Sequence, residues 1–220
     1  MPAPYRVTLA YFSRSPDSEA DALALSSGFR GVAGLSIARL DAHSAQATRW
    51  SRDPMKLAPL GRVAVDLSER PTEADLDRLC NNTDAALYLS ETHWPLPLRL
   101  NPGDTHPGTL QWCGFRKRQD IDQNVFIKQW LENHTSVAID TQQTDSYSQH
   151  RVLWHRGPAL DGIAEETFPL IAAQSEAEFF NAAGDPDKLK RHIETLVASS
   201  ARFLDFEAMS VVHLTEQRVR

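Results

Sequence analysis

A stretch of prolines and glycines near the middle of the chain most constrains how it can fold. Between residues 94 and 108 lie Pro95, Pro97, Pro102, Pro107, Gly103 and Gly108. Proline lacks a backbone N–H and its ring clashes with a preceding turn, so it cannot occupy a helix interior or a central strand. We therefore expect residues 101–108 to be a linker between two units, residues 1–100 and 109–220. Each unit has roughly 100 residues, which is enough to bury a core of its own.

The same order of elements is predicted on both sides of this linker. Alternating segments rich in β-branched and aromatic residues predict strands, and Ala/Leu-rich or acid-started segments predict helices. In the first unit we expect strands at 6–12, 32–40, 62–67 and 85–91, helices at 17–27 and 68–79, and a long loop at 41–59. In the second unit we expect strands at 109–116, 147–155, 162–168 and 206–214, and helices at 122–134, 175–183 and 188–201. Both units read β-α-β-β-α-β, so the sequence predicts an α+β fold made of two ferredoxin-like units.

Charge and composition exclude several classes of partner. The formal net charge is −6, which argues against chain-wide attraction to nucleic acid or to anionic lipid. No apolar run approaches the roughly 20 residues that cross a bilayer, and the first residues lack the apolar core of a signal peptide. Cys80 and Cys113 are the two cysteines, so no disulfide framework is expected. These features predict a cytoplasmic protein.

Three short patterns in the second unit follow one another in a recognisable order. The first is Phe-Arg-Lys-Arg at residues 115–118, followed by a helix that carries Phe126, Trp130 and His134. The second is Asp-Gly-Ile-Ala-Glu at residues 161–165, and the third is Arg-Phe-Leu-Asp at residues 202–205. In this order and spacing, residues 109–214 resemble the EthD family of the dimeric α+β barrel superfamily.

The resemblance implies an architecture and a general kind of activity. Members of this superfamily usually build a barrel by joining the sheets of two subunits. Two units in one chain then imply a barrel closed within the chain, with any homodimer a separate contact. The superfamily includes polyketide cyclases, monooxygenases, lactone isomerases and haem-binding enzymes, so the fold alone does not choose a reaction. We expect Leu9 and Tyr11 of the first unit to face Trp112 and Val152 of the second.

The helix at 122–134 carries the first candidate site. Phe126, Trp130 and His134 are spaced four residues apart, so they share one face of a helix. A structural interpretation makes them a core stripe whose histidine caps the end of the helix. A functional interpretation makes His134 a general acid or base at an aromatic pocket, because the ordinary pKa of histidine lies near 6.5. The resemblance favours the functional interpretation, and it predicts a cavity that both Trp130 and His134 line.

A second candidate lies on the strand at 147–155. Regular alternation places His150 and Trp154 on one face and His155 on the other, which argues against a metal site made of the two histidines. We expect His150, Trp154 and Tyr147 to line a pocket, although a purely structural role is the commoner one for such residues.

Charged residues of two motifs are candidate ligand anchors. Glu165 and Glu166 must point to opposite faces of their strand, and the one that faces the barrel interior could pair with Arg116 or Arg118 or act as a base. Arg118 could also anchor a carboxylate or an enolate, although basic residues at a strand end usually form a solvated turn.

The sequence predicts a small-molecule enzyme more readily than other classes of protein. No phosphate-binding loop, dinucleotide fingerprint, serine-nucleophile elbow or zinc motif is present, and we expect neither a metal nor a cofactor. The predicted ligand is small, hydrophobic and oxygenated, and His134 would assist its cyclisation, isomerisation, decarboxylation or cofactor-free oxygenation. Two alternatives stay open: a binding or accessory protein without turnover, and a haem-linked oxidoreductase.

Overall fold

A computed structural model describes residues 3–16 and 19–220 of the protein. Its elements, in chain order, are β1 (Tyr5–Tyr11), α1 (Glu19–Ser26), β2 (Val32–Arg39), η1 (Ser44–Trp50), β3 (Gly61–Leu67), α2 (Glu73–Asn82), β4 (Ala86–Leu96), β5 (Thr109–Lys117), α3 (Gln123–Ile127), η2 (Lys128–His134), α4 (Thr135–Thr141), β6 (Ser146–Arg156), β7 (Gly162–Phe168), α5 (Leu170–Gln174), α6 (Glu176–Phe179), α7 (Pro186–Ser200) and β8 (Leu204–Arg218). The predicted start of the first helix at residues 17–18 lies outside the described part of the chain, as do residues 1–2.

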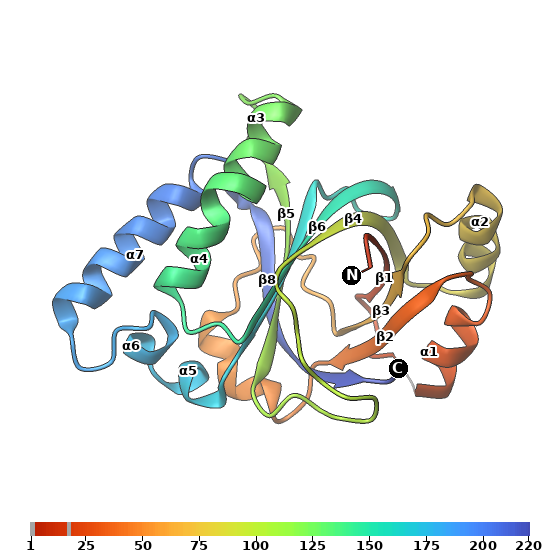
Figure 1. Ribbon diagram of the computed structural model, residues 1–220, viewed down its shortest axis with the longest axis horizontal. Helices are drawn as coiled ribbons and strands as arrows, with labels where there is room; N and C mark the ends of the chain where they lie inside the picture. The colour runs from red at the N-terminus through yellow and green to blue at the C-terminus, as the bar shows by residue number, and fades with distance from the viewer. Residues whose placement is uncertain (1–2, 17–18) are drawn as a thin grey trace.

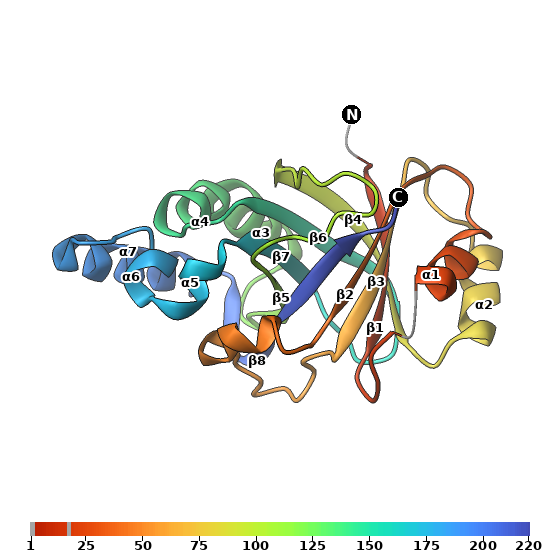
Figure 2. The same ribbon diagram turned by 90° about the horizontal axis from the view of Figure 1, so that it is seen from below.

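The strands form one closed antiparallel barrel with the order β1-β3-β2-β8-β5-β7-β6-β4. Strands β4, β1, β3 and β2 form the half from the first unit, and β6, β7, β5 and β8 form the half from the second. Both halves have the strand order of a ferredoxin-like unit. Helices α1 and α2 cover one side of the barrel and α3 to α7 lie on the opposite side (Figures 1 and 2). The predicted α+β fold, with an intramolecular barrel, is confirmed.

Two seams join the halves, and they differ in length. Strand β4 pairs with β6 from Leu87 to Leu96, with register shifts between Leu89 and Ser90 and between His93 and Leu96. Strand β2 pairs with β8 only from Ser36 to Arg39. Because both seams are hydrogen-bonded, neither half presents an unpaired sheet edge within the described strands.

Local sequence signals explain where the helices begin. Thr72 caps α2 through a capping box with Asp75, as the acidic first turn predicted. Asp122 caps α3 by accepting a hydrogen bond from the backbone of Val125, and Asp185 caps α7 by accepting one from Lys188. The helix predicted at 122–134 does not end there, because a π-helical turn at Lys128–His134 leads directly into α4.

Three apolar layers and one smaller cluster hold the fold together. One layer lies between the first half and α1 and α2, one lies inside the barrel, and one lies between the second half and α3 and η2. The smaller cluster joins the end of β7 to α5, α6 and η1. Trp112 and Val152 belong to the layer inside the barrel, as predicted. The prediction for Leu9 and Tyr11 was wrong, because both pack in the outer layer with Ala22 and Leu76. The inward face of β1 instead carries Arg6, Thr8 and Ala10, since alternate residues of a strand point to opposite faces.

Candidate functional site

The inner surface of the barrel has an apolar part and a polar part. The apolar part consists of Ala10, Ala38, Ala86, Tyr88, Leu110, Trp112, Leu160, Ile163, Val212 and Leu214. The polar part, which we call the barrel network, consists of Arg6, Ser36, Arg62, Asp66, Thr92, Ser148, His150, Glu165 and Glu216, all of them buried. Burying a charge is costly unless it is paired and hydrogen-bonded, so these side chains must satisfy one another.

Arg62, on β3, is the centre of this network. Its Nε donates to Glu165 Oε1 at 2.7 Å, its Nη2 donates to Glu216 Oε1 at 2.7 Å, and its Nη1 donates to Ser36 Oγ at 2.7 Å. The side chain of Arg62 has no solvent exposure. The forked guanidinium therefore spans the barrel from the first half to two carboxylates of the second.

Arg6, on β1, lies nearer to solvent and connects the network to it. Its Nε donates to Asp66 Oδ1 at 2.7 Å, and its Nη1 contacts both Glu165 Oε2 at 2.5 Å and His150 Nε2 at 3.1 Å. The guanidinium lies 4.9 Å from the centre of the Trp94 ring, a cation–π contact. Its Nη2 has no hydrogen-bond partner among the residues that the structure describes. This nitrogen is the one donor of Arg6 that a ligand could use.

The contacts of His150 determine which of its nitrogens carries the proton. An arginine only donates hydrogen bonds, so Nε2 of His150 must be the acceptor for Arg6 Nη1. Its Nδ1 then donates to Thr92 Oγ1 at 3.1 Å. Burial, and after it the charge of Arg6, lower the pKa of His150 to about 4. His150 is thus neutral at pH 7 and acts as an acceptor toward the arginine.

The ion pairs of the network outweigh the cost of burying its charges. Burial alone would raise the pKa of Glu165, but Arg62 and Arg6 hold that pKa well below the usual range of a carboxyl. In the same way, burial opposes the charge of Arg62, but Glu165 and Glu216 raise its pKa above the ordinary value. With Arg218, whose Nη1 lies 3.3 Å from Asp66, the arginines match the carboxylates in number. A ligand here therefore meets a site whose formal charges balance.

Two adjoining cavities lie at the mouth of the barrel beside Arg6. One has a volume of about 270 Å³, and its walls include Arg6, Asp66, Trp94, Leu98 and Glu216. The other, of about 20 Å³, continues inward from Arg6 and Leu98 to Ser148 and Glu165. We call them together the barrel mouth. Ligand sites are typically such cavities, with apolar walls and a few converging polar groups of perturbed pKa.

The residues predicted to share a face of the helix at 122–134 do not lie at the barrel mouth. They lie between the sheet of the second half and the helices that cover it. Phe126, Trp130 and His134 are all buried there and all contact Phe203, which confirms that they share a face. His134 Nδ1 is 3.0 Å from Ser199 Oγ, and burial lowers the pKa of His134 to about 4. The cavities at the barrel mouth, under α1 and α2, and in two surface grooves are lined by other residues. The predicted cavity between Trp130 and His134 is therefore not among them.

The outward face of the second half also buries ionisable groups. Tyr147 pairs in register with Glu166, and Glu166 pairs with Gln111. Burial raises the pKa of Glu166 to about 8, so its carboxyl is protonated at neutral pH, and its Oε1 has no hydrogen-bond partner. Tyr147 Oη accepts a hydrogen bond from Gln149. Glu165 and Glu166 therefore do face opposite ways, as predicted, and Glu165 is the one inside the barrel.

Two of the predicted placements were wrong for identifiable reasons. Trp154 does not share a face with His150, because the register shift opposite Leu89 and Ser90 adds one residue to β6. Trp154 consequently packs in the outer layer of the first half. Glu165 pairs with Arg6 and Arg62, neither of which was considered. The pairing predicted with Arg118 fails because Arg118 bonds Asp120 in an exposed turn.

The sequence interpretation missed most of the residues at the barrel mouth. Trp94 lies beyond the predicted end of the fourth strand at residue 91, because β4 extends to Leu96. Glu216 lies beyond the predicted end of the last strand, because β8 extends to Arg218. The predicted strands did contain Arg6, Arg62 and Asp66. The available signal was the spacing of Arg62 and Asp66, which are four residues apart and so lie on the same face of their strand. Within the described residues no group of three or more metal-binding side chains comes together, and no described helix is long and apolar enough to cross a membrane.

Comparison with known proteins supports the architecture. A protein described as anthrone oxidase-like matches 98% of this chain and 92% of its own length, with a TM-score of 0.54 and 9% sequence identity. The chain has the dimeric α+β barrel fold. A candidate monooxygenase from Lactobacillus acidophilus NCFM matches all of this chain and 95% of its own, with a TM-score of 0.46 and 9% identity. At such identities the likeness concerns the fold.

No family model and no curated protein sequence matches the chain. The anthrone oxidase-like structure supports the barrel fold, whereas the likeness to the EthD family rests on the three motifs of the second half.

Proposed function

We propose that this protein is a small-molecule enzyme, related to the EthD family, that binds a neutral, largely apolar, oxygenated substrate at the barrel mouth. One observation carries the proposal: Arg6 lines both cavities, offers an uncommitted Nη2, and lies next to the ionised carboxylate of Glu165. Trp94 and Leu98 supply apolar surface for the substrate. The balanced charges of the site favour a neutral substrate over an ionic one.

The chemistry that such a site supports is removal of a proton next to a carbonyl or phenol oxygen. Arg6 would stabilise the negative charge that develops on the oxygen, which is usually the largest contribution of such sites. Of the carboxylates that line the barrel mouth, Glu165 is the one that contacts Nη1 of Arg6 in the inner cavity, and it is ionised and ready to accept the proton. Because the pKa of Glu165 is depressed, Glu165 is a weak base. The acceleration of proton removal must therefore come mainly from the lowered pKa of the substrate beside Arg6. Cyclisation, isomerisation and cofactor-free oxygenation can each begin with an anion of this kind.

His150 replaces His134 in this proposal as the histidine that assists the reaction. It does not line either cavity, but its Nε2 holds Nη1 of Arg6 and so fixes the guanidinium. Its role is to position Arg6. The predicted cytoplasmic location and the absence of a cofactor remain part of the proposal.

The first test uses anthrone as a probe, because a structural neighbour is described as anthrone oxidase-like and because its acidic methylene gives an anion with charge on oxygen. We expect the protein to accelerate exchange of the methylene protons with D₂O without oxygen, followed by NMR. Leu98→Trp, which fills the barrel mouth, should abolish the acceleration, and Leu40→Trp, at an exposed position elsewhere, should retain it. Binding without exchange would favour the accessory protein, and a Soret band in the purified protein would favour the haem alternative.

A second test separates the two histidines. His150→Asn keeps a donor toward Thr92 but removes the acceptor for Arg6, so exchange should slow by roughly tenfold or more. His134→Asn keeps a partner for Ser199 and should leave the rate within about twofold. Circular dichroism of both variants controls for folding. If His134→Asn slows exchange and His150→Asn does not, the barrel mouth is the wrong site.

A further inference from the structure

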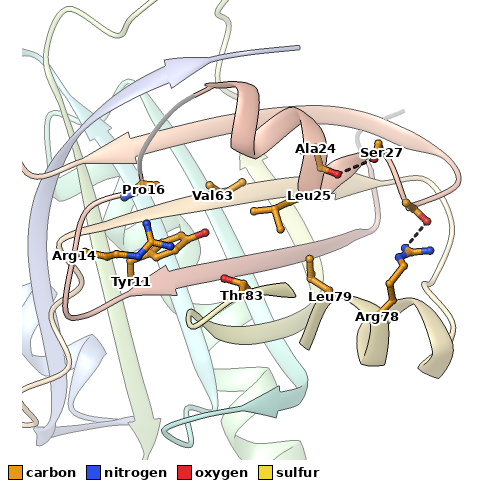
Figure 3. A pocket seen from close by; sticks show the side chains of 11 residues that line it. Tyr11, Arg14, Pro16, Ala24, Leu25, Ser27, Val63, Arg78, Leu79 and Thr83 are labelled. Carbon is orange, nitrogen blue, oxygen red and sulfur yellow. Dashed lines mark hydrogen bonds between the residues drawn. The ribbon is translucent and has the colours of Figure 1, made fainter. Parts of the chain in front are cut away.

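A larger cavity lies far from the barrel mouth, on the outer face of the first half. It has a volume of about 510 Å³ and lies between the sheet and helices α1 and α2 (Figure 3). The apolar part of its lining comes from three elements: Ala24 and Leu25 of α1, Leu79 of α2 and Val63 of β3. A volume in this range suits a small organic ligand. Nothing in the proposed reaction uses this cavity.

Two arginines lie at opposite ends of the cavity, and they differ in how they are held (Figure 3). Arg14 donates to both carboxylate oxygens of Asp84 and lies 4.9 Å from the centre of the Tyr11 ring. Its charge is therefore already matched. Arg78 has a side chain that is 48% exposed, donates one hydrogen bond to the Gly28 carbonyl, and lies 3.6 Å from Asp75. Other N–H groups of Arg78 remain available at the rim.

The charge of the lining residues is unusual for this chain. The protein as a whole has a net charge of −6, yet among the residues that the structure describes, those lining this cavity include two arginines and no carboxylate; Asp84 and Asp75, the partners of these arginines, lie outside the lining. The other polar side chains are the hydroxyl groups of Ser27 and Thr83, with Tyr11 at the far end. An apolar cavity with a cationic rim complements a molecule that has an apolar body and a single negative charge.

Gly28 leaves room for the guanidinium of Arg78. A Cβ atom there would lie 2.1 Å from Arg78 Nη2, so a larger residue would displace the end of this side chain. The hydrogen bond from Arg78 to the Gly28 carbonyl connects α2 with the segment that follows α1 across the opening of the cavity. This bond holds the cation at the rim.

We propose that this cavity is a second binding site, for an apolar monocarboxylic acid whose carboxylate pairs with Arg78. The apolar body of the acid lies on Leu25, Val63 and Leu79 and extends toward Tyr11. The inference goes beyond the proposed reaction, because the cavity lies outside the barrel and shares no lining residue with the barrel mouth.

The test is calorimetric titration of the full chain with 2-naphthoate and with 2-naphthalenemethanol, which is uncharged and of similar shape. Arg78→Gln should weaken binding of the acid about tenfold, as expected for a charge-assisted hydrogen bond, and leave binding of the alcohol within about twofold. Arg30→Gln, at a nearby exposed arginine outside the cavity, should change neither. Ala24→Trp should block both probes, and Leu23→Trp, an exposed neighbour on the same helix, should block neither.

Several outcomes would overturn the proposal. These are failure of 2-naphthoate to bind the wild-type protein, unchanged binding in Ala24→Trp, or equal weakening of acid and alcohol by Arg78→Gln in a folded protein. Leu98→Trp, which fills the barrel mouth, should leave binding of 2-naphthoate intact. That variant therefore distinguishes failure of this inference from failure of the proposed reaction.

Discussion

Replacing Arg62 with methionine is expected to lower the free energy of unfolding by about 3–5 kcal/mol. Methionine roughly keeps the unbranched shape of the side chain but removes its charge and its hydrogen bonds. Glu216 then loses its ion pair inside the barrel, and Glu165 retains only Arg6. A buried carboxylate without a partner accounts for most of the loss. Urea denaturation followed by circular dichroism measures it.

A matched surface variant provides the control. Arg52 pairs with Glu207, and their side chains are 51% and 80% exposed, so Arg52→Met should change stability by no more than about 1 kcal/mol. Adding Glu216→Gln to Arg62→Met should restore part of the lost stability, because it removes the uncompensated charge. If Arg62→Met lowers the free energy of unfolding no more than Arg52→Met does, the barrel network does not stabilise the fold.

Replacing Glu166 with glutamine is expected to stabilise the protein above neutral pH. Burial holds the pKa of Glu166 at about 8, whereas in the unfolded chain it is near 4.3. The native state therefore binds more protons than the unfolded state between these values, and wild-type stability falls as pH rises through this window. The slope is about 1.4 kcal/mol per pH unit, so between pH 6.5 and 8 the wild type should lose about 2 kcal/mol relative to Glu166→Gln.

Comparison with Glu166→Gln cancels the contribution of other buried groups. Burial lowers the pKa of His134, His150 and His213 to about 4, so they are neutral above pH 6.5 in the native protein. In the unfolded chain they titrate near pH 6.5, and this affects the wild type and the variant equally. Their effect appears at lower pH, where stability should fall as the unfolded chain takes up protons. Glu194→Gln, at an exposed carboxylate, should show the wild-type slope. Parallel curves for wild type and Glu166→Gln would mean that Glu166 is ionised in the native protein.

The sequence was sufficient to predict two ferredoxin-like units because its order of elements is repeated and the segment between the units is rich in proline, and the resemblance to the EthD family then implied the closed barrel. Those signals are local and do not depend on which face of a strand is buried. The inward faces were harder to assign because helices cover the outside of each sheet and the other half covers the inside. Both faces of β1 are buried, so the apolar character of Leu9 and Tyr11 could not show which face turns inward.

The candidate site was harder to predict than the fold for two physical reasons. Its residues come from strands that are distant in sequence, and Arg6 meets Glu165 only when the barrel closes. A register shift moved Trp154 to the other face, and no glycine or proline beside Leu89 or Ser90 marks that shift. The first and third motifs of the second half did identify real neighbours, since Phe126 and Trp130 of the first stack on each other, and both of them and His134 lie against Phe203 of the third.

The ion pairs inside the barrel are distributed unequally between its halves. Arg6 and Arg62 belong to the first half, and their partners Glu165 and Glu216 belong to the second. A barrel made of two identical subunits would repeat every inward side chain by symmetry, so both halves would carry the same set of arginines and carboxylates. Joining the halves in one chain removes that requirement. Each half is then free to become complementary to the other rather than to itself, and neither remains suited to pairing with its own copy.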